Sequence, residues 1–85
     1  MNITHKNYRF AAVIERRESS YVAYCPQLEE AGHVDGLDLE EVLAILKSAV
    51  GIVIGEMIEA GEEIPQSEQV IFTTVAVEIE EKQAI

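Results

Sequence analysis

Hydrophobic residues recur every three or four positions between Asp38 and Gly61, which is the only sustained helical pattern in the chain. Residues at these spacings lie on one face of an α-helix, so the pattern predicts one long amphipathic helix. Asp38 can accept a hydrogen bond in the first turn, and Glu41 can complete a capping box. Gly61 marks the C-terminal end, with Pro65 beyond it. The apolar stripe consists of Leu39, Val42, Leu43, Leu46, Ala49, Val50, Val53 and Met57.

Three shorter stretches are rich in β-branched and aromatic residues, which favour strands. Tyr8–Glu15 and Tyr21–Cys25 are separated by a polar break of hairpin length, so they are predicted to be antiparallel neighbours. A short third strand follows at His33–Asp35 and is closed by Gly36. Val70–Ile79 is the strongest strand signal in the chain. The long strands carry apolar residues on both faces.

The order β-β-β-α-β predicts an α+β fold in a single domain over residues 1–85, with a four-stranded, mostly antiparallel sheet and one long helix on one face. A right-handed crossover through the helix would place the last strand beside the first and parallel to it. Since one helix covers only one face, the other face is predicted to be buried against another copy. We therefore expect a homo-oligomer, at least a dimer. The candidate contacts between copies are Ala11, Val13, Ile45 and Ile52.

Two glycines interrupt the predicted helix, Gly51 and Gly55. Each weakens a helix by about 1 kcal/mol relative to alanine. One interpretation is the close approach of a second backbone, from the sheet beneath or from the helix of a partner. The other is that a small residue is simply tolerated above a bulky side chain of the sheet.

The formal net charge is −10, and it is unevenly distributed. Residues 1–37 carry four basic and five acidic side chains, a net charge of −1, whereas residues 38–85 carry two basic and eleven acidic ones, a net charge of −9. Such a surface repels phosphate, so direct binding of nucleic acid is not expected and a basic protein partner is favoured. The alternative is a solvated acidic face that serves solubility.

The remaining composition predicts a cytoplasmic protein that does not enter a membrane. No apolar run approaches the roughly 18 residues of a membrane span, and the N-terminus lacks the core of a signal peptide. The single cysteine, Cys25, cannot form an internal disulfide.

Candidate chemistry is sparse, and we expect no cofactor, no bound metal and no enzymatic activity. A metal site made by His33, Asp35 and Asp38 is conceivable, but strand ends and a helix cap explain these residues more simply. Cys25 lies in an apolar strand, where an inert thiol is the usual role. Adjacent acids such as Glu29 and Glu30 are typical of solvated loops.

Four segments together resemble the HicB antitoxin family: YVAYCPQL at 21–28, AGHVDG at 31–36, DLEEVL at 38–43 and GEEIP at 61–65. The resemblance covers most of residues 10–77. The positions that carry it are Pro26, Leu28, Gly36, Asp38, Glu41 and Pro65. Asp38 stands where the family usually has a threonine cap, and Glu29 and Glu30 replace its usual Pro-Gly.

The resemblance implies a β-β-β-α-β unit likened to a degraded ribonuclease H fold, without that nuclease's acidic metal cluster. It also implies a HicA-type partner, a small basic RNA-cleaving toxin that the antitoxin binds and blocks. Because few residues follow the last predicted strand, this would be the N-terminal type of domain, without the DNA-binding segment of many family members. The candidate partner-binding residues near the helix ends are Glu40, Glu41, Glu56, Glu59, Glu62 and Glu63.

Two other functions are weighed against this one. An orphan HicB-like protein could self-associate as a structural or small-ligand-binding module without a toxin. A retained nuclease activity is disfavoured because the required carboxylate constellation is missing from the sequence.

Overall fold

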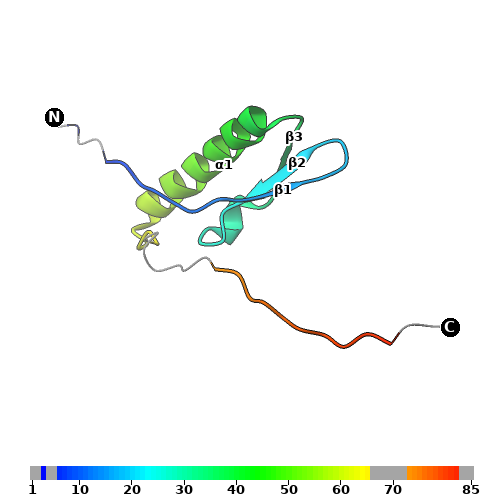
Figure 1. Ribbon diagram of the computed structural model, residues 1–85. Helices are drawn as coiled ribbons and strands as arrows, with labels where there is room; N and C mark the ends of the chain where they lie inside the picture. The colour runs from blue at the N-terminus through cyan, green and yellow to red at the C-terminus, as the bar shows by residue number, and fades with distance from the viewer. Residues whose placement is uncertain (1–2, 4–5, 66–72, 83–85) are drawn as a thin grey trace.

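The computed structural model describes residues 3, 6–65 and 73–82 of the chain. It is an α+β structure with a three-stranded antiparallel sheet and one long helix (Figure 1). The elements in chain order are β1 (Val13–Arg16), β2 (Tyr21–Tyr24), the 3-10 helix η1 (Glu29–Ala31), β3 (Val34–Gly36) and α1 (Leu39–Ala60).

The sheet has the order β1-β2-β3, and both neighbouring pairs are antiparallel. Ile14 lies opposite Ala23, and Ala23 lies opposite Val34, which fixes the register across all three strands. The polar break after β1 closes a tight turn, in which the N–H of Arg17 donates to the carbonyl of Ser20 over 2.7 Å. The predicted hairpin and the short third strand are confirmed.

The first strand is shorter than the predicted Tyr8–Glu15, because pairing with β2 begins only at Val13. Continuing the register would place Ala11 opposite Pro26, which has no N–H to donate to a strand ladder. The N–H of Ala11 instead donates to the side-chain oxygen Oε1 of Gln27, at 3.5 Å. Residues 8–12 therefore pass alongside α1 without strand pairing.

The predicted fourth strand, Val70–Ile79, is not part of this sheet over the residues that the structure describes. Residues 70–72 lie outside the described residues, and residues 73–82 run away from the helix and the sheet (Figure 1). All ten residues of 73–82 are exposed. A β-branched run favours a strand, but a strand forms only where a neighbour satisfies its backbone groups. The described sheet thus has three strands, not the four that were predicted.

Both ends of α1 agree with the prediction. Asp38 is the N-cap, and its Oδ1 accepts a hydrogen bond from the N–H of Glu41 over 2.8 Å. At the other end Gly61 adopts a left-handed conformation with φ of 70°. Its N–H donates to Ile58, and the N–H of Glu62 donates to Met57, which together form a Schellman motif.

The helix packs over β2, β3 and η1 and buries two small apolar clusters. Ala23 packs with Val42 and Leu46 near the start of the helix. Nearer its end, Leu28 packs with Val53 and Ile54, together with Cys25.

Three residues of α1 differ in burial from the sequence prediction, and two of them belong to the apolar stripe. Leu39 and Leu43 are exposed, whereas Ile54 is buried. The loop after Pro26 folds back onto α1 and brings Leu28 against Ile54, which extends the buried face on that side. No helix in the described part of the chain combines the length and the apolar character needed to cross a bilayer.

Candidate functional site

One side of α1 carries two exposed isoleucines between acidic side chains. At 100° per residue, Glu41, Ile45, Ile52, Glu56 and Glu59 fall within a narrow sector of the helix. Ile52 exposes 64% of its surface, and Ile45 exposes 38%. We call these five residues the outer helix face. It offers apolar contact in the middle and negative charge at both ends.

Gly51 and Gly55 lie on a neighbouring side of the helix, outside this face. An ideal Cβ built on Gly51 or on Gly55 would meet no atom within 4 Å in the structure. The sheet therefore does not approach these glycines, and neither glycine sits above a bulky sheet side chain. A partner's backbone could come close to α1 here, because both positions face open space.

An acidic hollow lies where η1 meets the last turns of α1. Its volume is about 300 Å³. Carboxylates of Glu30, Glu56 and Glu62 line it together with apolar side chains. These apolar side chains belong to Val53, Met57 and Ala60. The sequence pattern predicts a solvated loop at Glu30, and it holds no signal that η1 would bring this residue to the helix.

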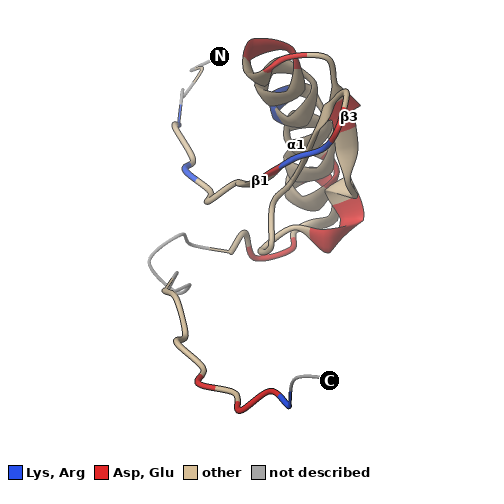
Figure 2. Ribbon diagram, turned by 45° about the vertical axis from the view of Figure 1, so that its right-hand side comes forward, with Lys and Arg blue, Asp and Glu red and all other residues tan. Residues whose placement is uncertain are grey.

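The six acids predicted to bind a partner are all exposed, but they form two separate groups. Glu40 and Glu41 lie in the first turn of α1. The other four belong to its last turns and to the segment after Gly61, and they are Glu56, Glu59, Glu62 and Glu63. The 22 residues of α1 span roughly 33 Å, so the groups lie at opposite ends of the helix. Figure 2 shows this negative charge at both helix ends, with the basic residues mainly along the N-terminal segment and β1.

The residues that carry the family resemblance hold the loop and the helix start in place. Pro26 ends β2, and Leu28 is 99% buried, with 1% of its surface exposed. Gly36 lies so close to the helix that an added Cβ would be 2.6 Å from the backbone nitrogen of Val42. Asp38 caps the helix through the N–H of Glu41. Pro65, the last of the set, is half-buried beyond the helix.

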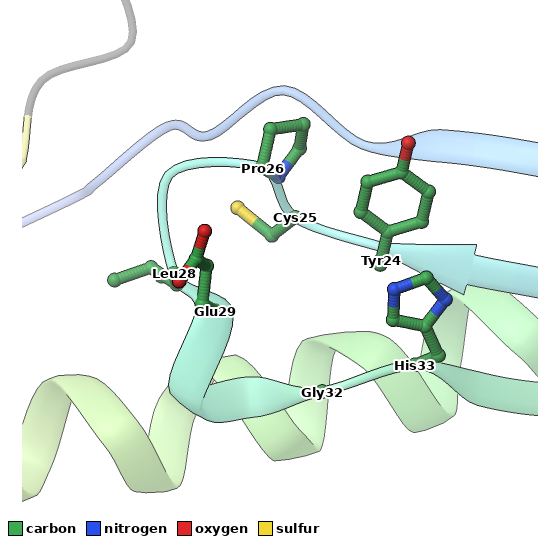
Figure 3. Close-up of a pocket in the computed structure, with 7 residues that line it drawn as sticks. All are labelled: Tyr24, Cys25, Pro26, Leu28, Glu29, Gly32 and His33. Carbon is green, nitrogen blue, oxygen red and sulfur yellow. The ribbon is translucent and has the colours of Figure 1, made fainter.

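A second hollow, of about 400 Å³, lies beside the loop after β2 (Figure 3). Its lining residues are Tyr24, Cys25, Pro26, Leu28, Glu29, Gly32 and His33. The rings of Tyr24 and His33 stack, with their centroids 4.3 Å apart and an angle of 12° between planes. Cys25 is a free, buried thiol. Polar groups able to orient a ligand are few here, and the hollow is largely shaped by the loop itself.

The conceivable metal site does not form. His33 stacks on Tyr24, and Asp38 caps α1, so neither side chain turns toward a shared centre with Asp35. Among the described residues no group of three or more His, Cys, Asp or Glu side chains could hold a metal ion.

The four residues predicted to contact another copy lie on three different surfaces. Ala11 lines a groove against α1. Val13 lies opposite Tyr24 on the sheet face away from the helix, because Ile14 and Ala23 face the helix. Ile45 and Ile52 belong to the outer helix face.

Comparisons of the chain with known protein families, with curated proteins and with solved structures found no match. A function for the chain is therefore inferred from its residues and their geometry.

Proposed function

We propose that the chain is an antitoxin of the HicB type, which binds a small, basic, RNA-cleaving toxin of the HicA type and neutralises it by protein contact. The observation that carries the proposal is the outer helix face, on which exposed isoleucines lie between carboxylates. It belongs to a chain of net charge −10. The motif residues between Pro26 and Glu41 add support, since each has a defined place in the fold.

Binding would combine steering by charge with apolar contact. Opposite potentials raise the rate of encounter and select one orientation of the partner. A lysine or arginine of the toxin would lay its aliphatic stem on Val53 and Met57 in the acidic hollow and place its charge among the carboxylates. Ile45 and Ile52 would then be covered by an apolar patch of the toxin.

In this proposal the chain has no chemistry of its own. It acts by covering the toxin's active site, in the cytoplasm where the toxin cleaves RNA. It does not bind nucleic acid directly, because its surface charge repels phosphate.

The proposal includes a four-stranded, ribonuclease H-like sheet and association into a homo-oligomer, at least a dimer. The fourth strand would come from residues 70–79 and lie parallel to β1. Its support is the β-branched sequence of this segment and the second edge of β1, with which no described strand pairs.

The test is binding of the basic protein encoded by a neighbouring reading frame, measured by titration calorimetry. Glu56, Glu59 and Glu62 are replaced together by glutamine. The matched control replaces Glu18 and Glu29 by glutamine and Asp35 by asparagine, three exposed acids outside the predicted partner contacts, which changes the net charge by the same amount away from the last turns of α1. We expect the first variant to bind about tenfold more weakly, since each exposed ion pair contributes up to about 1 kcal/mol. The control should bind like the unmodified chain, and equal losses in both variants would contradict a defined contact at the helix.

One observation also favours an orphan module that only self-associates. The apolar side chains of Ile45 and Ile52 would fit a second copy as well as a toxin. Self-association without any binding of the basic protein at low salt would favour this function over the antitoxin.

A further inference from the structure

An apolar groove lies between α1 and residues 8–12, the segment that leads into β1. Its volume is about 220 Å³. Tyr8, Phe10 and Ala12 line one side, and Leu43 and Leu46 line the other. Leu43 is exposed in this groove although it belongs to the apolar stripe of the helix. Residues 6–65 therefore do not cover the side of the core next to β1.

Residues 73–82 have the complementary pattern. Val75, Val77 and Ile79 alternate with other residues, so an extended chain would present all three on one face. Each is more than 70% exposed. The segment runs away from its own helix and sheet (Figure 1).

The charges of the two segments are complementary. Residues 6–18 carry Lys6, Arg9, Arg16 and Arg17 against Glu15 and Glu18, a net charge of +2. Residues 73–82 carry Glu78, Glu80 and Glu81 against Lys82, a net charge of −2. This match lets two copies of an acidic chain meet at these segments despite their overall repulsion.

The structure also indicates a direction for pairing. The chain leaving α1 at Gly61–Ile64 lines a common hollow with Lys6 and Tyr8, at the start of the N-terminal segment. A strand that starts at this end of the groove runs parallel to β1. If Val77 lies beside Ala12, the apolar face of residues 73–82 is aligned with the apolar side chains of residues 8–12. The same alignment brings Glu81 beside Arg16.

We propose that residues 73–82 of one copy occupy this groove in a second copy, so that two chains exchange their C-terminal strands. Each strand would add to the free edge of β1 and cover Leu43 of the partner. Exchanging a strand costs little free energy, because the strand makes the same contacts in the partner that it would otherwise make in its own chain. The exchange rests on the fourth strand proposed above, but not on the toxin. Strand pairing and toxin binding can therefore fail independently.

The test uses disulfide crosslinking between two different chains. In a background with Cys25→Ala, one chain carries Ala12→Cys and a second, longer tagged chain carries Val77→Cys. Strand exchange predicts that oxidation of the refolded mixture gives a crosslinked pair containing one chain of each kind. The absence of this mixed pair, or an internal crosslink in a chain that carries both cysteines, would overturn the proposal. The internal crosslink would show that each chain keeps its own strand.

A second measurement avoids dependence on the cysteine variants. Light scattering at micromolar concentration is expected to give a dimer for the unmodified chain. Ala76→Pro should give a monomer with its helical circular dichroism retained, because proline interrupts a strand ladder. The matched Ala76→Thr should remain a dimer, since threonine favours strands. A monomeric unmodified chain, or a dimeric proline variant, would contradict strand exchange.

Discussion

Because Gly36 has no side chain, β3 can lie directly against the first turn of α1. A Cβ at this position would lie 2.6 Å from the backbone nitrogen of Val42 and 2.8 Å from its Cα, so the helix start would have to move. We expect Gly36→Ala to lower the free energy of unfolding by about 1–3 kcal/mol. Urea unfolding followed by the helical circular dichroism signal measures this change.

The matched control is Gly55→Ala, because its added Cβ meets no atom within 4 Å. Alanine is the better helix former, so this variant should gain about 1 kcal/mol. A Gly36→Ala variant as stable as the unmodified chain would contradict the close approach of β3 to α1.

Leu28 is a second single residue on which the fold depends. It is 1% exposed and packs with Cys25, Val53 and Ile54. Leu28→Ala should lower the free energy of unfolding by about 2–5 kcal/mol, measured by urea or thermal unfolding. Leu37→Ala removes the same atoms from a residue that is 75% exposed and should cost little. Similar losses at both positions would show that the loop is not packed as described.

Properties of single residues that depend on a local sequence pattern could be predicted from the sequence. Properties that depend on the path of the loop after Pro26 could not. The capping by Asp38 follows from residue type and spacing alone. The burial of Ile54 and the position of Glu30 and Glu56 around one hollow both depend on the loop after Pro26 folding back onto α1. No periodicity in the sequence encodes that turn.

The helix N-terminus offers the most direct test at the scale of a single element. Asp38→Ala removes the acceptor for the N–H of Glu41 and should cost about 1 kcal/mol of unfolding free energy. Asp38→Asn keeps a side-chain oxygen in place and should lose much less. Chemical unfolding of both variants checks the prediction. Equal losses would show that the carboxylate charge, rather than the hydrogen bond, stabilises the helix.

Element boundaries were predictable for α1 and less so for the strands. The helix carries its own start and stop signals at Asp38 and Gly61. A strand depends on its neighbour, and Pro26 removes the donor that would have extended the pairing of β1 toward Tyr8. For the same reason strand propensity alone does not decide whether residues 73–79 pair. Only a free edge, such as that of β1, provides the partner.

For the whole molecule, the uneven charge leads to a prediction about rates. A chain of net charge −10 should associate with a basic toxin quickly at low salt, and added salt should slow association much more than dissociation. Stopped-flow mixing over a series of salt concentrations measures both rates. An association rate that does not change with salt would exclude steering by the acidic groups at the two ends of α1.

The direct test of neutralisation is an RNA-cleavage assay with the basic HicA-type toxin and increasing amounts of this chain. The proposed function predicts that cleavage falls to background as the chain is added, and that the variant with glutamine at Glu56, Glu59 and Glu62 must be added in larger amounts. Cleavage that continues unchanged in a large excess of the folded chain would contradict the antitoxin function.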